Sequence, residues 1–412
     1  MENENLKKLQ EAIIKGEITQ IVKCCILLSI DLGASDIHIE PAKTSVRIRL
    51  RVDGELREII EYPSNIHVAV IARIKIRSGL KIDEQRKPQD GRLVIMTDDN
   101  REVGLRVSVL PTIHGEKIVM RLQDKGQKVP SYTELGITGN NLDRLIEVLK
   151  NPNGVTLVTG PTGSGKTTTL YSILQELNTI DVNIMTLEDP VEYEMLGLAQ
   201  SQIRPDIGYD FFSGLRTALR QDPDIIMVGE IRDQETIEVA IKAALTGHMV
   251  LSTIHTNSAV STVTRIMDMG VKPFKITSAI RMIEAQRLVR RICPHCKEEY
   301  EPEEVIKDEI RKNLANCRDR EVQQMNLDKI TLFKGKGCDK CINSGYQGRK
   351  GVYEILLMNR EVVEMILEKA HEHDIKDKCV EHGMVTLLHD GVMKALQGET
   401  TIEEVYRVTT AE

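Results

Sequence analysis

The stretch Val155-Thr156-Leu157-Val158-Thr159-Gly160-Pro161-Thr162-Gly163-Ser164-Gly165-Lys166-Thr167 decides the fold of this 412-residue chain. It begins with a short apolar run, which is typical of a buried strand. The residues from Gly160 to Thr167 match the pattern G-x-x-x-x-G-K-[ST] of a phosphate-binding loop. A strand before the loop and a helix opening at Lys166 supply the context that this pattern requires, whereas an ordinary glycine-rich turn needs neither. The stretch therefore predicts a nucleotide-binding site.

The residue types in this loop suit phosphate chemistry. Glycines let backbone N–H groups approach phosphate oxygens closely, and the start of the following helix adds a favourable dipole. Lys166 is expected to reach the β- and γ-phosphates of ATP, and the Thr167 hydroxyl to hold the bridging Mg²⁺. Thr168 is expected to contact an earlier phosphate through its backbone. The predicted nucleotide-binding residues are Gly160, Pro161, Thr162, Gly163, Ser164, Gly165, Lys166, Thr167 and Thr168.

Three further apolar runs follow along the chain, at residues 183–187, 224–228 and 249–253, with helical segments between them. Apolar strands that alternate with helices are typical of a mainly parallel sheet covered on both faces. The sequence therefore predicts an α/β fold with a RecA-like P-loop ATPase core.

Glu230 follows the run at residues 224–228. A carboxylate at the end of such a strand can face Mg²⁺ or a water molecule beside a phosphate-binding loop. Without such a role, a charged side chain at the end of a strand of Val, Ile and Met is unfavourable. We predict Glu230 to be the general base, whereas Asp224 at the other end of the run has the alternative role of capping the strand.

Two more strands end in ionisable residues. Glu188 and Asp189 precede Pro190, which forces a turn at the sheet's carboxyl edge, and both are expected to point into one crevice. His255 lies beyond the strand at 249–253 and is expected at the same edge. We predict catalytic roles for Glu188 and His255 and a cofactor-binding role for Asp189. The alternatives are a turn-forming Asp189, and buried, hydrogen-bonded histidines at His248 and His255.

The region before the phosphate-binding loop has a different pattern. The run 45–52 alternates apolar and polar residues and leads into Asp53-Gly54, which indicates a strand entering a hairpin turn. A helical stretch at 66–80 and a second hairpin at 102–122 complete a small α+β domain. Residues 1–17 predict a short amphipathic helix, and the polar stretch 125–132 predicts the boundary with the next domain.

Two Cys-x-x-Cys pairs lie beyond residue 291: Cys293 with Cys296, and Cys338 with Cys341. Each pair can chelate one side of a tetrahedral ion, and four thiolates favour a structural Zn²⁺. The 41-residue stretch between the pairs, 297–337, is longer than in compact zinc fingers. A disulfide is the alternative, but an ATP-hydrolysing chain inside the cell keeps its thiols reduced.

The other cysteines lack paired spacing and are expected to be buried thiols: Cys24, Cys25, Cys317 and Cys379. The full domain prediction is a helix at 1–17, the small α+β domain at 18–130, the ATPase core at 131–291, a tetracysteine zinc-binding subdomain at 292–345 and a helical C-terminal region at 346–412.

Composition excludes several classes of protein. The net charge is −7, Trp is absent and Phe occurs four times, so neither a dominant basic field nor a set of aromatic stacking platforms for nucleic acid is evident. The N-terminus lacks the basic start and apolar core of a secretory signal. No apolar run reaches the roughly 18 to 20 residues that span a bilayer. We expect a cytoplasmic protein that reaches membranes only through partners.

These segments resemble the type II secretion and type IV pilus assembly ATPases, the GspE and PilB family. The resemblance covers nearly everything after about residue 18. It rests on six segments in the family's order: 35–41 (Ser-Asp-Ile-His-Ile-Glu-Pro), 88–92 (Pro-Gln-Asp-Gly-Arg), the phosphate-binding loop, 187–192 (Leu-Glu-Asp-Pro-Val-Glu), 229–233 (Gly-Glu-Ile-Arg-Asp), and 246–248 (Thr-Gly-His) with His255.

The resemblance implies a hexameric ring in which arginines contact ATP across subunits. Those arginines correspond to Arg106 and Arg121 in the small domain and to Arg216, Arg220 and Arg232 in the motor domain. If the hairpin turns at Ile113-His114, Arg106 lies directly opposite Arg121, and their repulsion is relieved by an anion such as a triphosphate. Splayed, solvated arginines are the alternative.

Other arginines carry less information. Arg47, Arg49 and Arg51 share one strand face, for which a solvated surface is favoured. Arg216 and Arg220 are spaced one helical turn apart, so both can face one side of a helix. A solvated helix face explains that spacing equally well.

The complete interpretation is a hexameric Mg-ATP-hydrolysing motor that powers pilus assembly or protein secretion through an inner-membrane platform protein and associates with that membrane only peripherally. Within the family, the cysteine tetrad resembles assembly and secretion ATPases rather than retraction ATPases. The family usually carries a longer N-terminal docking domain than the 17 residues expected here, so either docking differs or the chain is truncated. Two rival interpretations are a nucleic-acid-translocating ring and a nucleotide-gated scaffold without hydrolysis.

Overall fold

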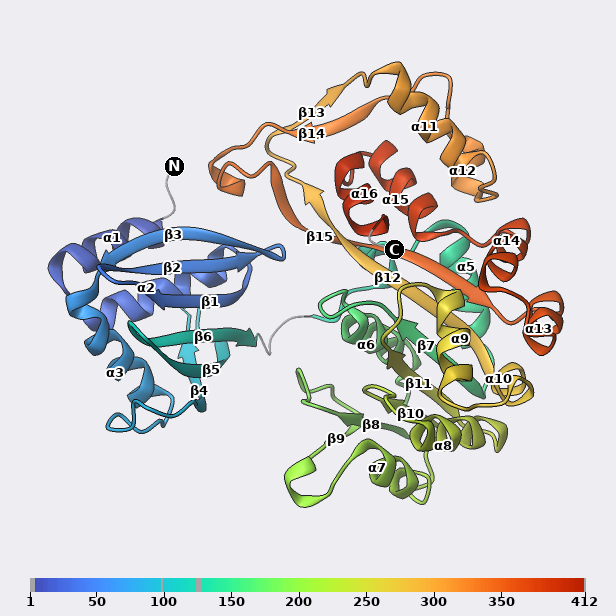
Figure 1. Ribbon diagram of the computed structural model, residues 1–412, viewed down its shortest axis with the longest axis horizontal. Coiled ribbons are helices and arrows are strands. Elements are labelled where there is room, and N and C mark those ends of the chain that lie inside the picture. Colours follow the sequence, from blue (N-terminus) through green and yellow to red (C-terminus); the bar gives the residue numbers. More distant parts are fainter. Residues whose placement is uncertain (1–3, 98, 124–127, 411–412) are drawn as a thin grey trace. The chain divides into compact units, whose positions relative to one another are not determined.

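The computed structural model describes residues 4–97, 99–123 and 128–410. The chain divides into two compact units (Figure 1). The first is built on residues up to Lys128 and includes the short segment Asp339–Asn343. The second comprises Val129–Cys338 and Ser344 onward.

The first unit is a six-stranded antiparallel sheet in the order β3-β2-β1-β6-β5-β4. Helices α1, α2 and α3 pack with the apolar side of this sheet in one hydrophobic core. The helices are α1 (Glu4–Lys15), α2 (Ile18–Asp31) and α3 (His67–Arg77), and the 3₁₀ helix η1 spans Ser64–Ile66. The strands are β1 (Ala34–Pro41), β2 (Ser45–Val52), β3 (Glu55–Pro63), β4 (Gln89–Met96), β5 (Glu102–Thr112) and β6 (Gly115–Gln123).

Alternation along the strands explains why this sheet has one buried and one open face. In β2 the residues Val46, Ile48 and Leu50 are buried, while the arginines between them point to the other face. The predicted turn at Ile113-His114 is confirmed, because Thr112 pairs with Gly115 across the hairpin. The predicted strand at 45–52, the helix within 66–80 and the hairpin at 102–122 are also confirmed.

The second unit contains a seven-stranded sheet in the order β15-β12-β7-β11-β10-β8-β9. All its neighbouring strands run parallel except the antiparallel pair β12 and β15, so the predicted mainly parallel sheet is confirmed. Four strands coincide with predicted runs: β7 (Gly154–Thr159), β8 (Ile184–Glu188), β10 (Ile225–Val228) and β11 (Met249–Ile254). The other strands are β9 (Ala199–Gln202), β12 (Ile280–Ile292) and β15 (Tyr346–Leu357).

Helices cover both faces of this sheet (Figure 1). One core contains residues of α7 (Phe211–Ala218), α8 (Gln234–Leu245), α9 (Ala259–Asp268) and α10 (Pro273–Ala279). The other contains residues of α5 (Gly139–Leu149) and α6 (Lys166–Leu177). The short α4 spans Tyr132–Leu135, and η2 spans Pro205–Ile207.

The sequence analysis did not identify β12 and β15 as strands of this sheet. Their polar residues, including Glu284 and Gln286, lie within long strands whose periodicity is neither a clean alternation nor a continuous apolar run. β12 is largely buried because it lies between β7 and β15, whereas β15 is the edge strand and is buried mainly over Val352–Leu356.

A further set of elements lies between β12 and β15 in the sequence: β13 (Lys297–Tyr300), α11 (Glu304–Leu314), α12 (Arg320–Gln324), β14 (Leu332–Gly335) and η3 (Asp339–Cys341). The predicted helical C-terminus is confirmed, with α13 (Arg360–Leu367), α14 (Glu372–Glu381), α15 (Leu387–Leu396) and α16 (Ile402–Thr409). Residues of α11, α15 and α16 share one core.

The predicted domain boundaries stay predictions, and part of the boundary stretch 125–132 lies outside the described residues. Among the residues that the structure describes, no helix combines the length and apolar character needed to cross a bilayer.

Candidate nucleotide and zinc sites

The phosphate-binding loop connects β7 to α6 at the carboxyl edge of the parallel sheet. Gly160 has a φ of 150°, and a Cβ there would come within 2.5 Å of the Gln286 carbonyl oxygen and 2.6 Å of the Ser164 hydroxyl. Ser164 is buried, and its hydroxyl has no hydrogen-bond partner among the described residues. A glycine at a crowded position and an unsatisfied buried hydroxyl fit a loop that wraps an oxygen-rich ligand such as a phosphate chain.

Lys166 is the first residue of α6 and is 9% exposed. Its Nζ donates to the carbonyl oxygens of Gly160 at 2.8 Å and of Pro161 at 3.1 Å. Burial lowers the pKa of Lys166, and the nearby carboxylate of Glu230 opposes that shift. The ammonium is therefore held inside the curve of the loop, where it can meet phosphate oxygens.

Gln286 is a member of this site that sequence reasoning missed. It lies on β12 and is 1% exposed. Its Nε2 donates to the Ser164 carbonyl oxygen, and its Oε1 accepts from the Thr169 hydroxyl at 2.8 Å. One amide thus connects the loop to the helix that follows it. No local motif identifies this residue, because its partners are more than 100 positions away in the sequence.

Glu284 lies two residues before Gln286 and is fully buried. It is paired in register with Val158 of β7. Neither carboxylate oxygen has a hydrogen-bond partner among the described residues, and burial raises the pKa of Glu284 to about 8. The carboxyl group is therefore held mainly protonated at neutral pH, directly behind the residue that contacts the loop.

Glu230, Arg232 and His255 form a cluster just beyond the carboxyl ends of β10 and β11. One Glu230 oxygen accepts from the Arg232 guanidinium, and the other lies 3.5 Å from His255 Nε2. Burial lowers the pKa of His255, the charge of Lys166 lowers it further, and Glu230 raises it. The structure therefore brings these three predicted residues to the same edge of the sheet as Lys166.

Glu188 and Asp189, which were expected to point into one crevice, have different surroundings. Glu188 is 2% exposed and accepts hydrogen bonds from Thr186 Oγ1 at 2.6 Å and from Gln200 Nε2 at 3.1 Å, as well as one from the Tyr171 hydroxyl. Asp189 is exposed and close enough to Arg232 to influence its charge. β8 ends at Glu188, so Glu188 is the last residue of a buried strand and Asp189 is the first residue of the turn that follows. Their shared role at one site stays a prediction.

Two other ionisable residues considered from the sequence, His248 and Asp224, lie at the amino edge of the parallel sheet. His248 precedes β11, and its Nδ1 lies 3.0 Å from the Ala243 carbonyl oxygen. Asp224 precedes β10 and accepts from the Asn183 backbone N–H at 2.7 Å. Both therefore match the structural alternatives given for them from the sequence, a hydrogen-bonded histidine and a residue that fixes the start of a strand.

Arg216 and Arg220 are both exposed but do not share a helix. Helix α7 ends at Ala218, and Arg220 lies beyond its C-cap. The Arg220 guanidinium donates back to the Arg216 carbonyl oxygen at 2.7 Å, while the Arg216 guanidinium lies 5.5 Å from the ring centroid of Phe212. The helix stops before Asp222, which has a φ of 53°, and Pro223, which cannot supply a helical N–H.

Arg106 and Arg121 lie directly opposite each other on β5 and β6, as predicted. Arg121 is 67% exposed, and its Nε donates to an Asp36 oxygen at 2.9 Å. Arg106 is exposed. On β2, which is separated from β6 by β1, Arg49 lies 2.7 Å from Glu40, and Arg47 lies 3.8 Å from Glu58.

The four paired cysteines come together. Their Sγ atoms all lie within 4.8 Å of one another, and Cys293 Sγ lies 3.9 Å from Cys338 Sγ. Four sulfurs around Zn²⁺ at a Zn–S distance of about 2.3 Å lie about 3.8 Å apart, whereas disulfide sulfurs lie only about 2.05 Å apart. The residues therefore fit a tetrahedral zinc ion and not a disulfide. The set is Cys293, Cys296, Cys338 and Cys341.

The remaining cysteines are buried, as predicted. Burial raises the pKa of Cys25 and of Cys379 to about 12, and that of Cys317 to about 11. Thiols with such pKa values are rarely deprotonated and are poor nucleophiles.

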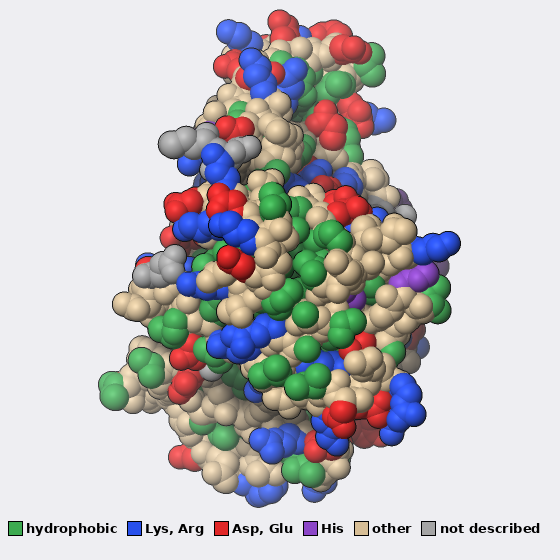
Figure 2. All heavy atoms as spheres, turned by 90° about the vertical axis from the view of Figure 1, so that its left-hand side faces the viewer, with side chains coloured by type: hydrophobic (Ala, Val, Ile, Leu, Met, Phe, Trp, Pro, Cys, Tyr) green, Lys and Arg blue, Asp and Glu red, His purple; other side chains and the backbone are tan. Residues whose placement is uncertain are grey.

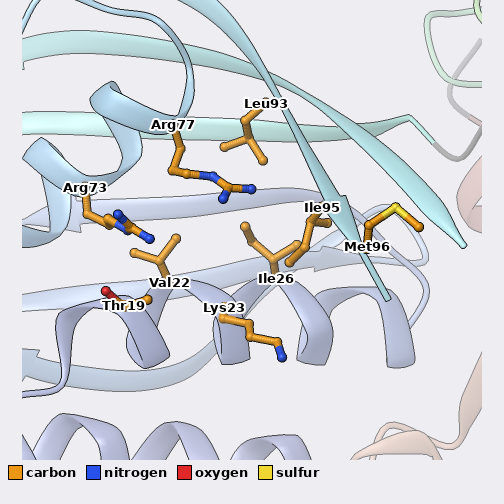
Figure 3. A pocket seen from close by; sticks show the side chains of 9 residues that line it. All are labelled: Thr19, Val22, Lys23, Ile26, Arg73, Arg77, Leu93, Ile95 and Met96. Carbon is orange, nitrogen blue, oxygen red and sulfur yellow. The ribbon is translucent and has the colours of Figure 1, made fainter. Parts of the chain in front are cut away.

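A cavity of about 330 Å³ lies in the first unit between α2, α3 and β4 (Figure 3). Val22 and Ile26 of α2 and Leu93 of β4 give it an apolar wall, and Arg73 and Arg77 of α3 bring guanidinium groups to it. It contains none of the site residues predicted from the sequence. On the face drawn in Figure 2, basic, acidic and hydrophobic side chains are interspersed.

The parallel sheet, the loop at its carboxyl edge and the Glu230 carboxylate beyond β10 at the same edge define a P-loop ATPase. Comparison with known proteins identifies the family of P-loop ATPases to which the chain belongs. The family described as "Type II/IV secretion system protein" matches residues 11–407, and the chain belongs to this family of ATPases.

Individual relatives agree with this assignment. The type IV pilus assembly ATPase PilB of Myxococcus xanthus is 43% identical over 404 residues, which are 98% of this chain and 70% of that protein. The type II secretion system ATPase E of Vibrio cholerae is 43% identical over 408 residues, covering 99% of this chain and 78% of that protein. The crystal structure of the ATPase DotB of Legionella pneumophila superimposes with a TM-score of 0.67 at 23% identity, covering 95% of this chain and 96% of that one, and supports the fold alone.

Proposed function

We propose that this ATPase is a Mg-ATP-driven motor that works as a homo-hexamer and powers pilus assembly or type II protein secretion through an inner-membrane platform protein. The relatives named for pilus assembly and for type II secretion support the two alternatives equally, at 43% identity each. In this proposal the chain is cytoplasmic and associates with the inner membrane peripherally, through its partners.

The observation that carries the hydrolytic part is the convergence at one sheet edge. Lys166 opens the helix after the phosphate-binding loop, and Glu230 lies near enough to influence the protonation of Lys166. A carboxylate and a phosphate-binding lysine at the same carboxyl edge of the sheet, beyond β10 and β7, are what in-line attack of water on a γ-phosphate requires.

Each residue has a proposed role. Lys166 binds the β- and γ-phosphates, the Thr167 hydroxyl and Asp189 hold Mg²⁺, and Glu230 accepts a proton from the attacking water. Mg²⁺, when bound, neutralises charge on the phosphate oxygens. His255 and Arg232 keep the Glu230 carboxylate oriented, because each contacts one of its oxygens. Glu188, whose oxygens are held by three donors, supports the strand next to the site.

The proposed hexamer brings Arg106 and Arg121 of one subunit to the phosphates bound by its neighbour, with Arg216, Arg220 and Arg232 contributing from the motor domain. The exposure of Arg106 and Arg121 leaves both guanidinium groups accessible to a ligand. A site shared between subunits cannot turn over in a dilute monomer.

The test is the specific Mg-ATPase activity measured against protein concentration. We expect activity per chain to rise steeply as subunits associate and then to level off. A flat profile that extends into the monomeric range would keep the P-loop ATPase but remove the shared site. Strong stimulation of activity by single-stranded DNA would instead favour a nucleic-acid motor.

The cysteine tetrad is proposed to hold one structural Zn²⁺. Four thiolates fill the tetrahedral coordination of zinc, so no position remains for a catalytic water. Metal analysis of the purified chain should find one zinc per subunit, and Cys338→Ser should lower both zinc content and the unfolding temperature. Cys379→Ser is the matched control. A fold that is equally stable with and without metal would contradict a structural zinc.

A further inference from the structure

The open face of the first unit's sheet carries arginines at three successive positions of one cross-strand row. Arg92 of β4 is paired in register with Arg106 of β5, and Arg106 is paired with Arg121 of β6. Directly opposed residues of antiparallel strands lie on the same face, with Cα atoms about 4.5–5.5 Å apart. The three side chains therefore start within roughly 10 Å of one another.

Negative charge in this row is confined to one end. Beyond Arg121 the row continues with Asp36 of β1 and Arg51 of β2. The Asp36 carboxylate is nearly buried and lies 2.9 Å from Arg121 Nε and 3.8 Å from Arg51 Nε. At the other end, Arg92 and Arg106 have no acidic partner within 4.0 Å in the part of the chain that the structure describes.

Neighbouring cations on the same face are neutralised. The carboxylate of Glu40 lies 2.7 Å from both Arg49 and Lys117, and Arg47 lies 3.8 Å from Glu58. These groups belong to a surface network of paired charges. The pair Arg92 and Arg106 differs from them because no acidic group among the described residues lies within ion-pairing distance of either guanidinium.

Small and uncharged residues border the pair. In β5, Gly104 and Ser108 flank Arg106 on the same face. A Cβ at Gly104 would be in ordinary contact with Gln123 of β6, at 3.5 Å from its carbonyl oxygen. The acidic residue of β4 on the same face is Asp90, two positions before Arg92.

We propose that Arg92 is a third phosphate-binding arginine, and that Arg92, Arg106 and Arg121 together bind the phosphate chain of ATP held by a neighbouring subunit. Each guanidinium offers several N–H donors in a planar fork that matches phosphate oxygens. Asp36 orients Arg121 at one end, and Arg92 extends the row at the other. This inference rests on the proposed function, which assigns Arg106 and Arg121 to the same ligand.

The experiment uses the full chain with Arg92→Ala, Arg106→Ala and, as a matched control, Arg47→Ala on the same sheet face. Steady-state kcat/KM for Mg-ATP is measured at protein concentrations where wild-type activity per chain is constant. Loss of a hydrogen-bonded charge should lower kcat/KM about 10- to 100-fold in Arg92→Ala. Arg47→Ala should stay near wild type.

Two further readouts separate phosphate binding from a structural role. Guanidinium ion, at concentrations that leave the fold intact, should partly restore turnover to Arg92→Ala and should not affect Arg47→Ala. Mixing Arg92→Ala with the phosphate-loop variant Lys166→Ala should recover activity, because some interfaces then combine an intact loop with an intact arginine row.

The outcomes are distinguishable. Normal turnover in Arg92→Ala beside impaired turnover in Arg106→Ala would overturn the role of Arg92 and leave the proposed function in place. Normal turnover in both would remove the shared site as well. Impaired turnover with a lowered unfolding temperature, no guanidinium rescue and no recovery on mixing would assign Arg92 a structural role and also overturn the inference. Arg92→Lys, which keeps the charge, should retain partial activity.

Discussion

In the second unit, Lys166 is 9% exposed and donates to two backbone carbonyl oxygens of its own loop, whereas in the first unit Arg92 and Arg106 are exposed and face each other across two strands. The lysine is held by its own loop before any ligand arrives. The two arginines are positioned by strand register. Among the described residues, neither lies within ion-pairing distance of an acidic group. One region is therefore preorganised for binding, and the other is suited to respond when a phosphate chain reaches it.

This difference predicts different failures. Damage to the phosphate-binding loop should impair nucleotide binding in every assembly state. Damage to the arginine row should impair turnover in the assembled protein and leave binding by the dilute chain unchanged.

The largest expected effect is that of Lys166→Ala. Because the ammonium is the cation built into the loop, its loss should abolish measurable ATP binding and lower turnover by about 10³-fold or more. Binding is measured with a fluorescent ATP analogue on the dilute chain. Lys150→Ala, at the exposed C-cap of α5, is the control. Unchanged binding in Lys166→Ala would invalidate the comparison.

Next in size is Glu230→Gln. The amide cannot accept a proton from water, so phosphate release should fall by about 10²- to 10⁴-fold while ATP affinity stays near wild type. Glu235→Gln, in the first turn of α8, should be nearly silent. Single-turnover and binding assays together measure the effect. Retained turnover would reassign the general base.

A smaller effect is expected from Gln286→Leu. The change leaves the Ser164 carbonyl and the Thr169 hydroxyl without their buried partner, so ATP affinity should fall about 10-fold. If the loop is preorganised by this amide, the loss appears in dilute binding and not only in the assembled protein. The exposed Gln397→Leu serves as control. If Gln286→Leu lowered turnover of the assembled protein but left ATP binding by the dilute chain unchanged, Gln286 would not preorganise the loop and would behave like the arginine row.

The last expected effect is on stability rather than on nucleotide binding or turnover, and it concerns Glu284, behind the loop. Its pKa is about 8 in the folded chain against an ordinary value of 4.5, so between these values the folded state keeps a proton that the unfolded state has released. Its contribution to the unfolding free energy therefore falls as pH rises through this window, by an amount on the order of 5 kcal/mol in total, and is constant above it.

Glu284→Gln removes this titration. Urea unfolding followed from pH 5 to 9 should show a smaller loss of stability with pH in the variant than in wild type, with the difference between the two growing up to about pH 8. The exposed Glu368→Gln should reproduce the wild-type profile. Parallel profiles for Glu284→Gln and wild type would show that the carboxyl group is not held protonated.

Local patterns allowed the sequence to predict the parts of the site that local chemistry determines. The phosphate-binding loop, Glu230 and the two Cys-x-x-Cys pairs each lie in one short segment, and the hairpin turn at Ile113-His114 followed from counting residues. Residues placed by long-range register were missed. Gln286 and Arg92 act through neighbours on other strands, and β12 was not identified because buried polar groups obscured its periodicity.

Two details depend on local backbone geometry. Glu188 and Asp189 were assigned to one crevice, but β8 ends at Glu188, which is buried with hydrogen-bonding partners in Tyr171, Thr186 and Gln200, whereas Asp189 is exposed. Arg220 has helical spacing from Arg216, yet α7 ends two residues earlier. In both places the sequence spacing was right and the local backbone geometry decided the outcome.

Strand β12 has a mechanical consequence. Gln286, which contacts the phosphate-binding loop, and Cys293, the first predicted zinc ligand, are separated by seven residues of nearly continuous strand, a length of roughly 23 Å. Most of that length is hydrogen-bonded to β15, which stiffens it. Because the strand is stiff, a movement of the phosphate-binding loop that displaces Gln286 should also displace the cysteine cluster. The cluster is therefore mechanically coupled to the loop through β12.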